Sequence, residues 1–225
     1  PDGLVALASD RARELARRSG SKPSVIGASL GGIASLVAEA NAEREGESLF
    51  SSLVLVDITP RVNAEGVANI HGFMRAHARE GFASIEDAAD AVARYLPHRP
   101  RPKSNEGLKK NLRLSPDGRW RWHWDPRFIE GMRRHPDSRE RNEAMLIEAA
   151  RRIRIPALLV RGSSSELVQE AHVKEFMQLV PHAEYVDVSG ARHMVAGDKN
   201  DHFSTAVLGF LGKLDSGQLP GVRAN

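Results

Sequence analysis

The sequence predicts an α/β fold in which a parallel sheet is covered by helices on both faces. Short apolar runs alternate along the chain with stretches of helical periodicity, which is the order expected for a parallel sheet. The run Leu-Val-Leu-Val at 53–56 is apolar without alternation, as expected for a strand whose two faces are both covered. Residues 61–153 have no strong strand pattern and predict a mostly helical insertion, which leaves 1–60 and 154–225 as the core.

The glycine-rich stretch at 27–32, Gly-Ala-Ser-Leu-Gly-Gly, predicts a sharp turn between a strand and a helix. An apolar pair precedes it, and apolar residues at helical spacing follow it. The spacing G-x-S-x-G is typical of a nucleophile elbow, in which the serine takes a strained backbone conformation. We expect Gly27 and Gly31 to let the strand and the helix approach closely. Ser29 is therefore a candidate nucleophile.

The other elements follow from apolar periodicity and from turn residues at their ends. In the predicted core they are a helix at 4–18, strands at 23–27, 53–56, 156–160 and 183–188, and helices ending near 43 and spanning 166–179 and 202–214. In the predicted insertion they are helices at 64–79, 85–95 and 137–152 and a hairpin at 112–124.

Composition limits the function classes. With 41% hydrophobic and 27% charged residues in 225, the chain can bury one sizeable core. It has no cysteine, which excludes disulfides and thiolate chemistry. No apolar run reaches the ~20 residues that cross a bilayer, and no secretory signal is recognisable, so we expect a cytoplasmic protein without a membrane partner. A net charge of only +3 does not favour nucleic acid as a partner.

Three predicted strand ends carry the residues of nucleophilic catalysis. In open parallel sheets, ligands bind beyond the carboxyl ends of the strands. Ser29 follows one strand, Glu166 lies in the loop after another, and His193 lies in the loop after the last. A serine hydroxyl needs a histidine to take its proton, and a carboxylate must orient that histidine. The order serine, acid, histidine is the one described for nucleophile-elbow hydrolases.

The chain resembles the α/β-hydrolase superfamily in the segments VIGASLGG, LVLVDITP, IPALLVRGSSSELV and VDVSGARHMVAGDKNDHF. Residues 61–153 take the place of the family's cap insertion. The resemblance implies Ser29 as nucleophile, His193 as general base and Glu166 as orienting acid, with no cofactor. It also implies that the backbone amide of Leu30 binds the oxyanion. A serine at the elbow argues against the branch with an aspartate nucleophile.

Several assignments stay open. Asp57 is a rival acid because it also ends a strand, and Glu166 could instead complement a helix dipole. The three tryptophans at 120, 122 and 124 are expected to pack the insertion, with Trp124 as a candidate substrate contact together with Met194. His71 and His77 do not share a helical face, so no metal site is predicted.

The chain begins at the helix before the elbow strand, whereas the family places further strands earlier. One of the earlier loops supplies the second oxyanion donor in that family. We therefore expect the chain by itself to be a weak catalyst, and the uncovered apolar edge of its elbow strand leaves self-association into a homo-oligomer open.

The function predicted from the sequence is hydrolysis of a small ester, lactone or related acyl substrate through a Ser-His-Glu triad. Three alternatives remain. The fold could serve a non-catalytic binding protein, or the same triad could serve a cofactor-free perhydrolase or a carbon–carbon bond hydrolase.

Overall fold

The computed structural model describes residues 2–127 and 137–219, and the chain divides into two units. The larger unit comprises Pro1–Ala64 and Asp137–Asn225, and the smaller comprises Glu65–Pro136. The smaller unit is shorter than the insertion predicted at 61–153, because helix α6 (Asp137–Arg151) packs against α2 (Leu30–Arg44) of the larger unit. Residues 128–136 of the predicted insertion lie outside the described residues.

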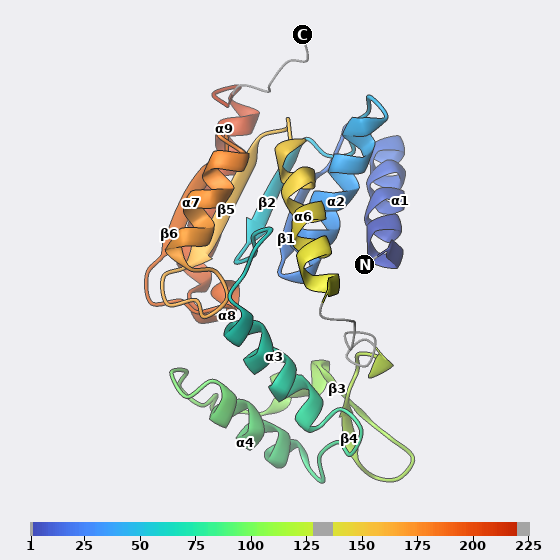
Figure 1. Cartoon of the computed structure of the whole chain (residues 1–225). Coiled ribbons are helices and arrows are strands. Elements are labelled where there is room, and N and C mark those ends of the chain that lie inside the picture. The colour runs from blue at the N-terminus through green and yellow to red at the C-terminus, as the bar shows by residue number, and fades with distance from the viewer. Residues whose placement is uncertain (1, 128–136, 220–225) are drawn as a thin grey trace. The chain divides into compact units, whose positions relative to one another are not determined.

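A parallel sheet forms the centre of the larger unit (Figure 1), with the strand order β1, β2, β5, β6. Its strands are β1 (Ser24–Ala28), β2 (Ser52–Val56), β5 (Ala157–Gly162) and β6 (Glu184–Val188). Every residue of β2 and β5 is buried, as the unbroken apolar runs predicted. In the described sheet β1 is an edge strand, and its Ile26 is 48% exposed.

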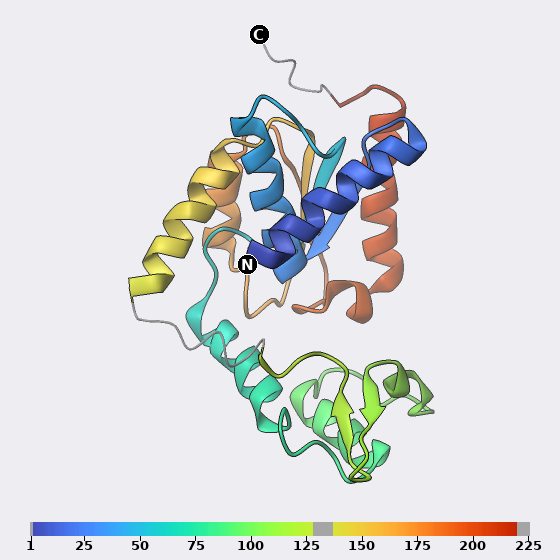
Figure 2. The same ribbon diagram turned by 90° about the vertical axis from the view of Figure 1, so that its right-hand side faces the viewer.

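Helices cover both faces of this sheet, which confirms the predicted fold class. In Figure 2, α9 lies on one side of the strands, with α2 and α6 on the other. The further helices of the larger unit are α1 (Asp2–Ser19), which packs on α2, α7 (Glu170–Leu179), the short α8 (Val195–Asp198) and α9 (Asn200–Asp215).

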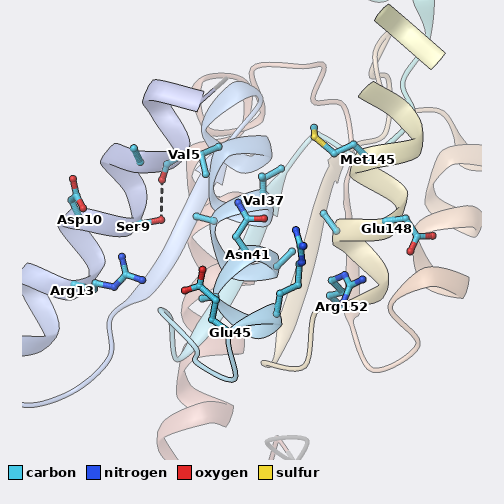
Figure 3. A pocket seen from close by; sticks show the side chains of 16 residues that line it. Val5, Ser9, Asp10, Arg13, Val37, Asn41, Glu45, Met145, Glu148 and Arg152 are labelled. Carbon is cyan, nitrogen blue, oxygen red and sulfur yellow. Dashed lines mark hydrogen bonds between the residues drawn. The ribbon is translucent and has the colours of Figure 1, made fainter. Parts of the chain in front are cut away.

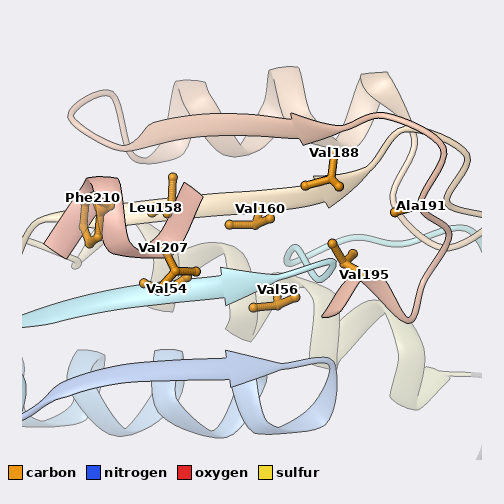
Figure 4. Close-up of a cluster of buried hydrophobic side chains, with 9 residues drawn as sticks. All are labelled: Val54, Val56, Leu158, Val160, Val188, Ala191, Val195, Val207 and Phe210. Atoms are coloured by element: carbon orange, nitrogen blue, oxygen red, sulfur yellow. The ribbon is translucent and has the colours of Figure 1, made fainter. Parts of the chain in front are cut away.

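Side chains that alternate between the two faces of each strand form the core between the sheet and α9. Val54 and Val56 on β2 and Leu158 and Val160 on β5 belong to one buried cluster with residues of β6, α8 and α9 (Figure 4). Leu55 is directed to the other face, where its side chain approaches Gly32 of α2. The period of two along each strand thus supplies apolar groups to both layers.

The smaller unit contains helices and a hairpin. Its elements are α3 (Ala64–Ala76), α4 (Ile85–Tyr95), the 3₁₀ helix η1 (Glu106–Lys110), β3 (Leu112–Leu114) and β4 (Trp120–Trp122). The hairpin is antiparallel, as predicted, and Phe82 bridges to Trp120. Trp120 and Trp122 pack against the buried cluster around Phe82 and Leu112, whereas Trp124 lies beyond the strand.

Asp117 in the hairpin turn has a pKa lowered to about 2, mainly by its hydrogen bonds from the guanidinium of Arg121 and also by the backbone amide of Arg119. Because the pKa is lower in the folded chain than its ordinary value, this contact stabilises the turn above about pH 4 and is lost as pH falls toward about 2. We expect hydrogen exchange of the β3 and β4 amides to accelerate over that window, beyond the intrinsic pH dependence of exchange. Asp117→Asn should remove this dependence; an unchanged dependence in the variant would contradict the assignment to Asp117.

Within the described residues, no helix combines the length and apolarity that crossing a membrane requires.

Candidate active site

Ser29 connects β1 to α2 in a strained backbone conformation. Its φ of 48° and ψ of −119° lie outside the regions that residues with a side chain normally occupy. Two hydrogen bonds hold the turn: the Ser29 amide donates to the Val56 carbonyl at 3.2 Å, and the Ile33 amide donates to the Ser29 carbonyl at 3.1 Å. The predicted elbow is present. Its strained conformation is held by one hydrogen bond to β2 and one within the first turn of α2.

Close approach at the elbow depends on Gly27 and Gly32. A Cβ on Gly27 would lie 2.5 Å from the Gly32 Cα, and one on Gly32 would lie 2.8 Å from the Gly27 carbonyl oxygen. Gly31, predicted from the pentapeptide to have this role, has open space where its Cβ would be. That prediction is wrong because Gly32, one residue further along the first turn of α2, faces β1.

Asp57 follows β2, the strand next to the elbow strand, and its carboxylate is fully buried. Its φ of 49° turns the chain sharply at the strand end. Oδ1 accepts a hydrogen bond from the Gly162 amide at 3.1 Å, and Oδ2 accepts one from the Ser165 hydroxyl at 2.7 Å. These donors, which belong to β5 and to the loop after it, offset the cost of burying the charge.

His193 lies in the loop after β6, and its ring contacts Asp57. Nδ1 is 2.8 Å from Asp57 Oδ2, and the imidazole side chain is 14% exposed. Because a carboxylate only accepts, Nδ1 carries the hydrogen in this pair, which leaves Nε2 of the neutral ring as an acceptor. The histidine is thereby oriented as a general base requires.

Gly162 places the histidine loop against the end of β5. A Cβ there would lie 2.4 Å from the Arg192 carbonyl oxygen and 2.6 Å from that of Ala191. The loop is further held by hydrogen bonds from the Ser164 amide to the Ala191 carbonyl and from the Gly190 amide to the Ser163 hydroxyl. The backbone just before His193 is therefore packed directly on the strand end that also donates to Asp57.

The structure brings Asp57, and not Glu166, to His193, which corrects the first choice of acid. Within the described residues Glu166 has a buried Oε2 without a hydrogen-bond partner, and no bond joins it to the imidazole. The reason lies in the loop: the Ser165 amide donates to the Gly162 carbonyl, and this turn directs Ser165 rather than Glu166 to Asp57. Asp57, the rival acid from the sequence, directly follows β2, whereas Glu166 lies further along the loop after β5.

Ser29, Asp57 and His193 thus all lie beyond the carboxyl ends of the parallel strands, at the same end of the sheet. The strand register sets Ala28 beside Val56, so the residues that follow them are neighbours. In the part of the chain that the structure describes, the Ser29 hydroxyl forms no hydrogen bond with His193. Catalytic hydrogen bonds are often long in ligand-free enzymes and shorten when substrate binds.

The remaining predicted site residues have different positions. Leu30 is the first residue of α2, so its amide has no intrahelical acceptor and is available to an oxyanion. Met194 is 50% exposed beside His193. Trp124 belongs to the smaller unit, which is described by itself, so a substrate contact by it stays a prediction. The described residues contain no cluster of three or more metal-ligating side chains.

A groove of about 760 Å³ lies away from these residues, among α1, α2 and α6 (Figure 3). Apolar residues such as Val37 and Met145 line it together with charged ones such as Arg13 and Glu148. None of its lining residues belongs to the strand-end cluster, so the groove is separate from the candidate active site.

Comparison with known proteins identifies the fold. No protein-family model matches the chain. The 3-hydroxybutyrate-oligomer hydrolase of Cupriavidus necator is 25% identical over 191 residues, which cover 82% of this chain. The chain spans 64% of that relative's length.

Solved structures are similar over most of the chain. An esterase of Mycobacterium tuberculosis is 26% identical with a TM-score of 0.68, over 93% of this chain and 67% of that one. E-2-(acetamidomethylene)succinate hydrolase is 24% identical with a TM-score of 0.72, over 91% of this chain and 74% of that one. With the elbow, the strand order and the histidine loop, these similarities show that the chain has the α/β-hydrolase fold.

Proposed function

We propose that the chain is a serine hydrolase that cleaves a small ester or related acyl substrate, with Ser29 as nucleophile, His193 as general base and Asp57 as orienting acid. The observation that carries this proposal is the 2.8 Å contact between His193 Nδ1 and Asp57 Oδ2 at the same sheet edge as the strained Ser29. Asp57, the alternative acid from the sequence, thus takes the role first assigned to Glu166.

The reaction follows from these positions. Nε2 of His193 takes the hydroxyl proton as Ser29 attacks the carbonyl carbon, and the Leu30 amide donates to the oxyanion. The imidazolium is stabilised by the Asp57 carboxylate and then gives its proton to the leaving alkoxide, so that an alcohol departs and Ser29 is acylated. Water, deprotonated by His193, attacks the acyl-enzyme and releases the acid, which restores Ser29.

The relatives support an ester as the substrate class. One solved relative is named an esterase, and the curated relative is named as a hydrolase of 3-hydroxybutyrate oligomers. Hydroxy-acid oligomers are joined by ester bonds, and cleavage of such a bond requires the acyl-transfer chemistry described above. An ester of a small hydroxy acid is therefore the first substrate class to assay.

A fluorophosphonate probe tests the proposal without knowledge of the substrate. The folded chain should be labelled at Ser29, as shown by mass spectrometry of the proteolysed adduct, and Ser29→Ala should abolish labelling. The exposed Ser164, in the loop after β5, offers a control: Ser164→Ala should be labelled at the wild-type rate. Absence of labelling of the folded wild-type chain, or labelling that persists in Ser29→Ala, would refute the assignment.

A further inference from the structure

Ser165 lies in the loop after β5 and is 8% exposed. Its hydroxyl has three partners within hydrogen-bond distance: the Leu167 amide and the Val168 amide at 3.0 Å each, and Asp57 Oδ2 at 2.7 Å. A buried hydroxyl with this number of contacts has little freedom to rotate. Its direction is therefore determined by what each partner can donate or accept.

Only one of these three partners can accept the hydrogen of the Ser165 hydroxyl. Both amides are donors, so they use the two lone pairs of the serine oxygen. The remaining O–H must donate to an acceptor, and Asp57 Oδ2 is the acceptor in reach. Ser165 therefore donates to the carboxylate, and the amides of its own loop determine the direction of that donation.

Oδ2 is also the oxygen that His193 Nδ1 contacts, so Ser165 and His193 bond the same atom. The other oxygen is held by the Gly162 amide. With a donor on each oxygen besides the imidazole, the carboxylate cannot rotate about its Cβ–Cγ bond without losing a hydrogen bond. Oδ2 is then kept in the position at which it accepts from Nδ1–H.

Hydrogen bonds from Arg161 hold the loop around Ser165 in place. The buried guanidinium of Arg161 donates to the carbonyl of Val168 at 2.6 Å and to that of Ser163 at 3.3 Å, so it joins the two sides of the turn. It also pairs with Asp187 of β6 at 3.1 Å. The loop that carries Ser165 is thereby attached to the strand before the histidine loop.

We propose that Ser165 is a positioning residue for the reaction: its hydroxyl fixes the Asp57 carboxylate, which in turn keeps His193 in the tautomer with hydrogen on Nδ1. This inference rests on the proposed function for its catalytic consequence, but its structural content is the tautomer and can be measured without turnover. Ser165 acts through Asp57 and does not itself contact the reacting atoms.

The test compares Ser165→Ala with Ser164→Ala, the same substitution one residue earlier at an exposed position. Histidine labelled with ¹⁵N reports the tautomer by NMR, and the His193 signals are identified by their loss in His193→Gln. The wild-type chain and Ser164→Ala should show the Nδ1–H tautomer, whereas Ser165→Ala should show a mixture. With a p-nitrophenyl ester, Ser165→Ala should lower kcat about 10- to 100-fold, with KM changed less than about twofold, because removing a hydrogen bond to a charged group has an effect of this size.

The alternative outcomes are distinguishable. Ser165→Ala leaves the Leu167 and Val168 amides without their acceptor. A lower unfolding temperature alone therefore does not separate a purely structural role of Ser165 from a positioning role. A lower unfolding temperature together with an unchanged tautomer and a kcat within about threefold of wild type would show a structural role and overturn the proposal. A tautomer that responds to Ser165→Ala in a chain whose Ser29 is neither acylated nor labelled would refute the proposed function and leave the positioning contact established.

Discussion

Replacing Asp57 with asparagine should lower kcat about 10⁴-fold, the size found when the acid of a serine triad is changed to its amide. The physical reason is the set of donors around the carboxylate. Oδ2 accepts from both Ser165 and His193, so an amide nitrogen at that place would present hydrogens to groups that need an acceptor. His193 would then be favoured in the opposite tautomer, with hydrogen on Nε2, and could not take the serine proton.

Glu166→Gln is the matched control, because it makes the same chemical change in the acid first assigned from the sequence. We expect its kcat to stay within about threefold of wild type. Both rates are measured as hydrolysis of p-nitrophenyl acetate and as the rate of fluorophosphonate labelling at Ser29, with circular dichroism to establish that each variant is folded. A large loss in Glu166→Gln and a small one in Asp57→Asn would return the role of orienting acid to Glu166.

Gly27→Ala should reduce the free energy of unfolding by about 3 kcal/mol and abolish labelling of Ser29. The added methyl group would lie 2.5 Å from the Gly32 Cα and 2.6 Å from the Gly32 nitrogen. Both are backbone atoms of α2, which cannot rotate away as a side chain can. Either β1 or α2 must therefore shift, and the strained turn that presents Ser29 lies between them.

Gly31→Ala provides the control within the same motif. Its methyl group would meet nothing within 4 Å, and alanine favours a helix over glycine by about 1 kcal/mol, so we expect unchanged or slightly higher stability and full labelling. Urea unfolding and labelling kinetics measure both effects. Equal destabilisation by the two substitutions would show that the G-x-S-x-G spacing, rather than the contact between Gly27 and Gly32, limits the turn.

The sequence alone predicted most of the elements and a candidate nucleophile. Buried strands are apolar without interruption, as at 53–56, and amphipathic helices repeat every three to four residues, so both can be recognised locally. The elbow is also local, since it needs a small residue, a serine and glycines within six positions. His193 follows a strand and a glycine turn, and that placement was sufficient to make it a candidate.

Only the tertiary structure decided which carboxylate contacts the histidine. The pair is 136 residues apart, and both Asp57 and Glu166 lie in segments that end a strand. The choice depends on the direction of a side chain in the turn after β5, where Ser165 points to Asp57 and Glu166 does not. The role of Gly32 and the place of α6 in the larger unit were likewise decided by packing between segments. Local periodicity and turn chemistry are properties of neighbouring residues, whereas the contacts of Asp57 exist only once distant strand ends are brought to the same end of the sheet.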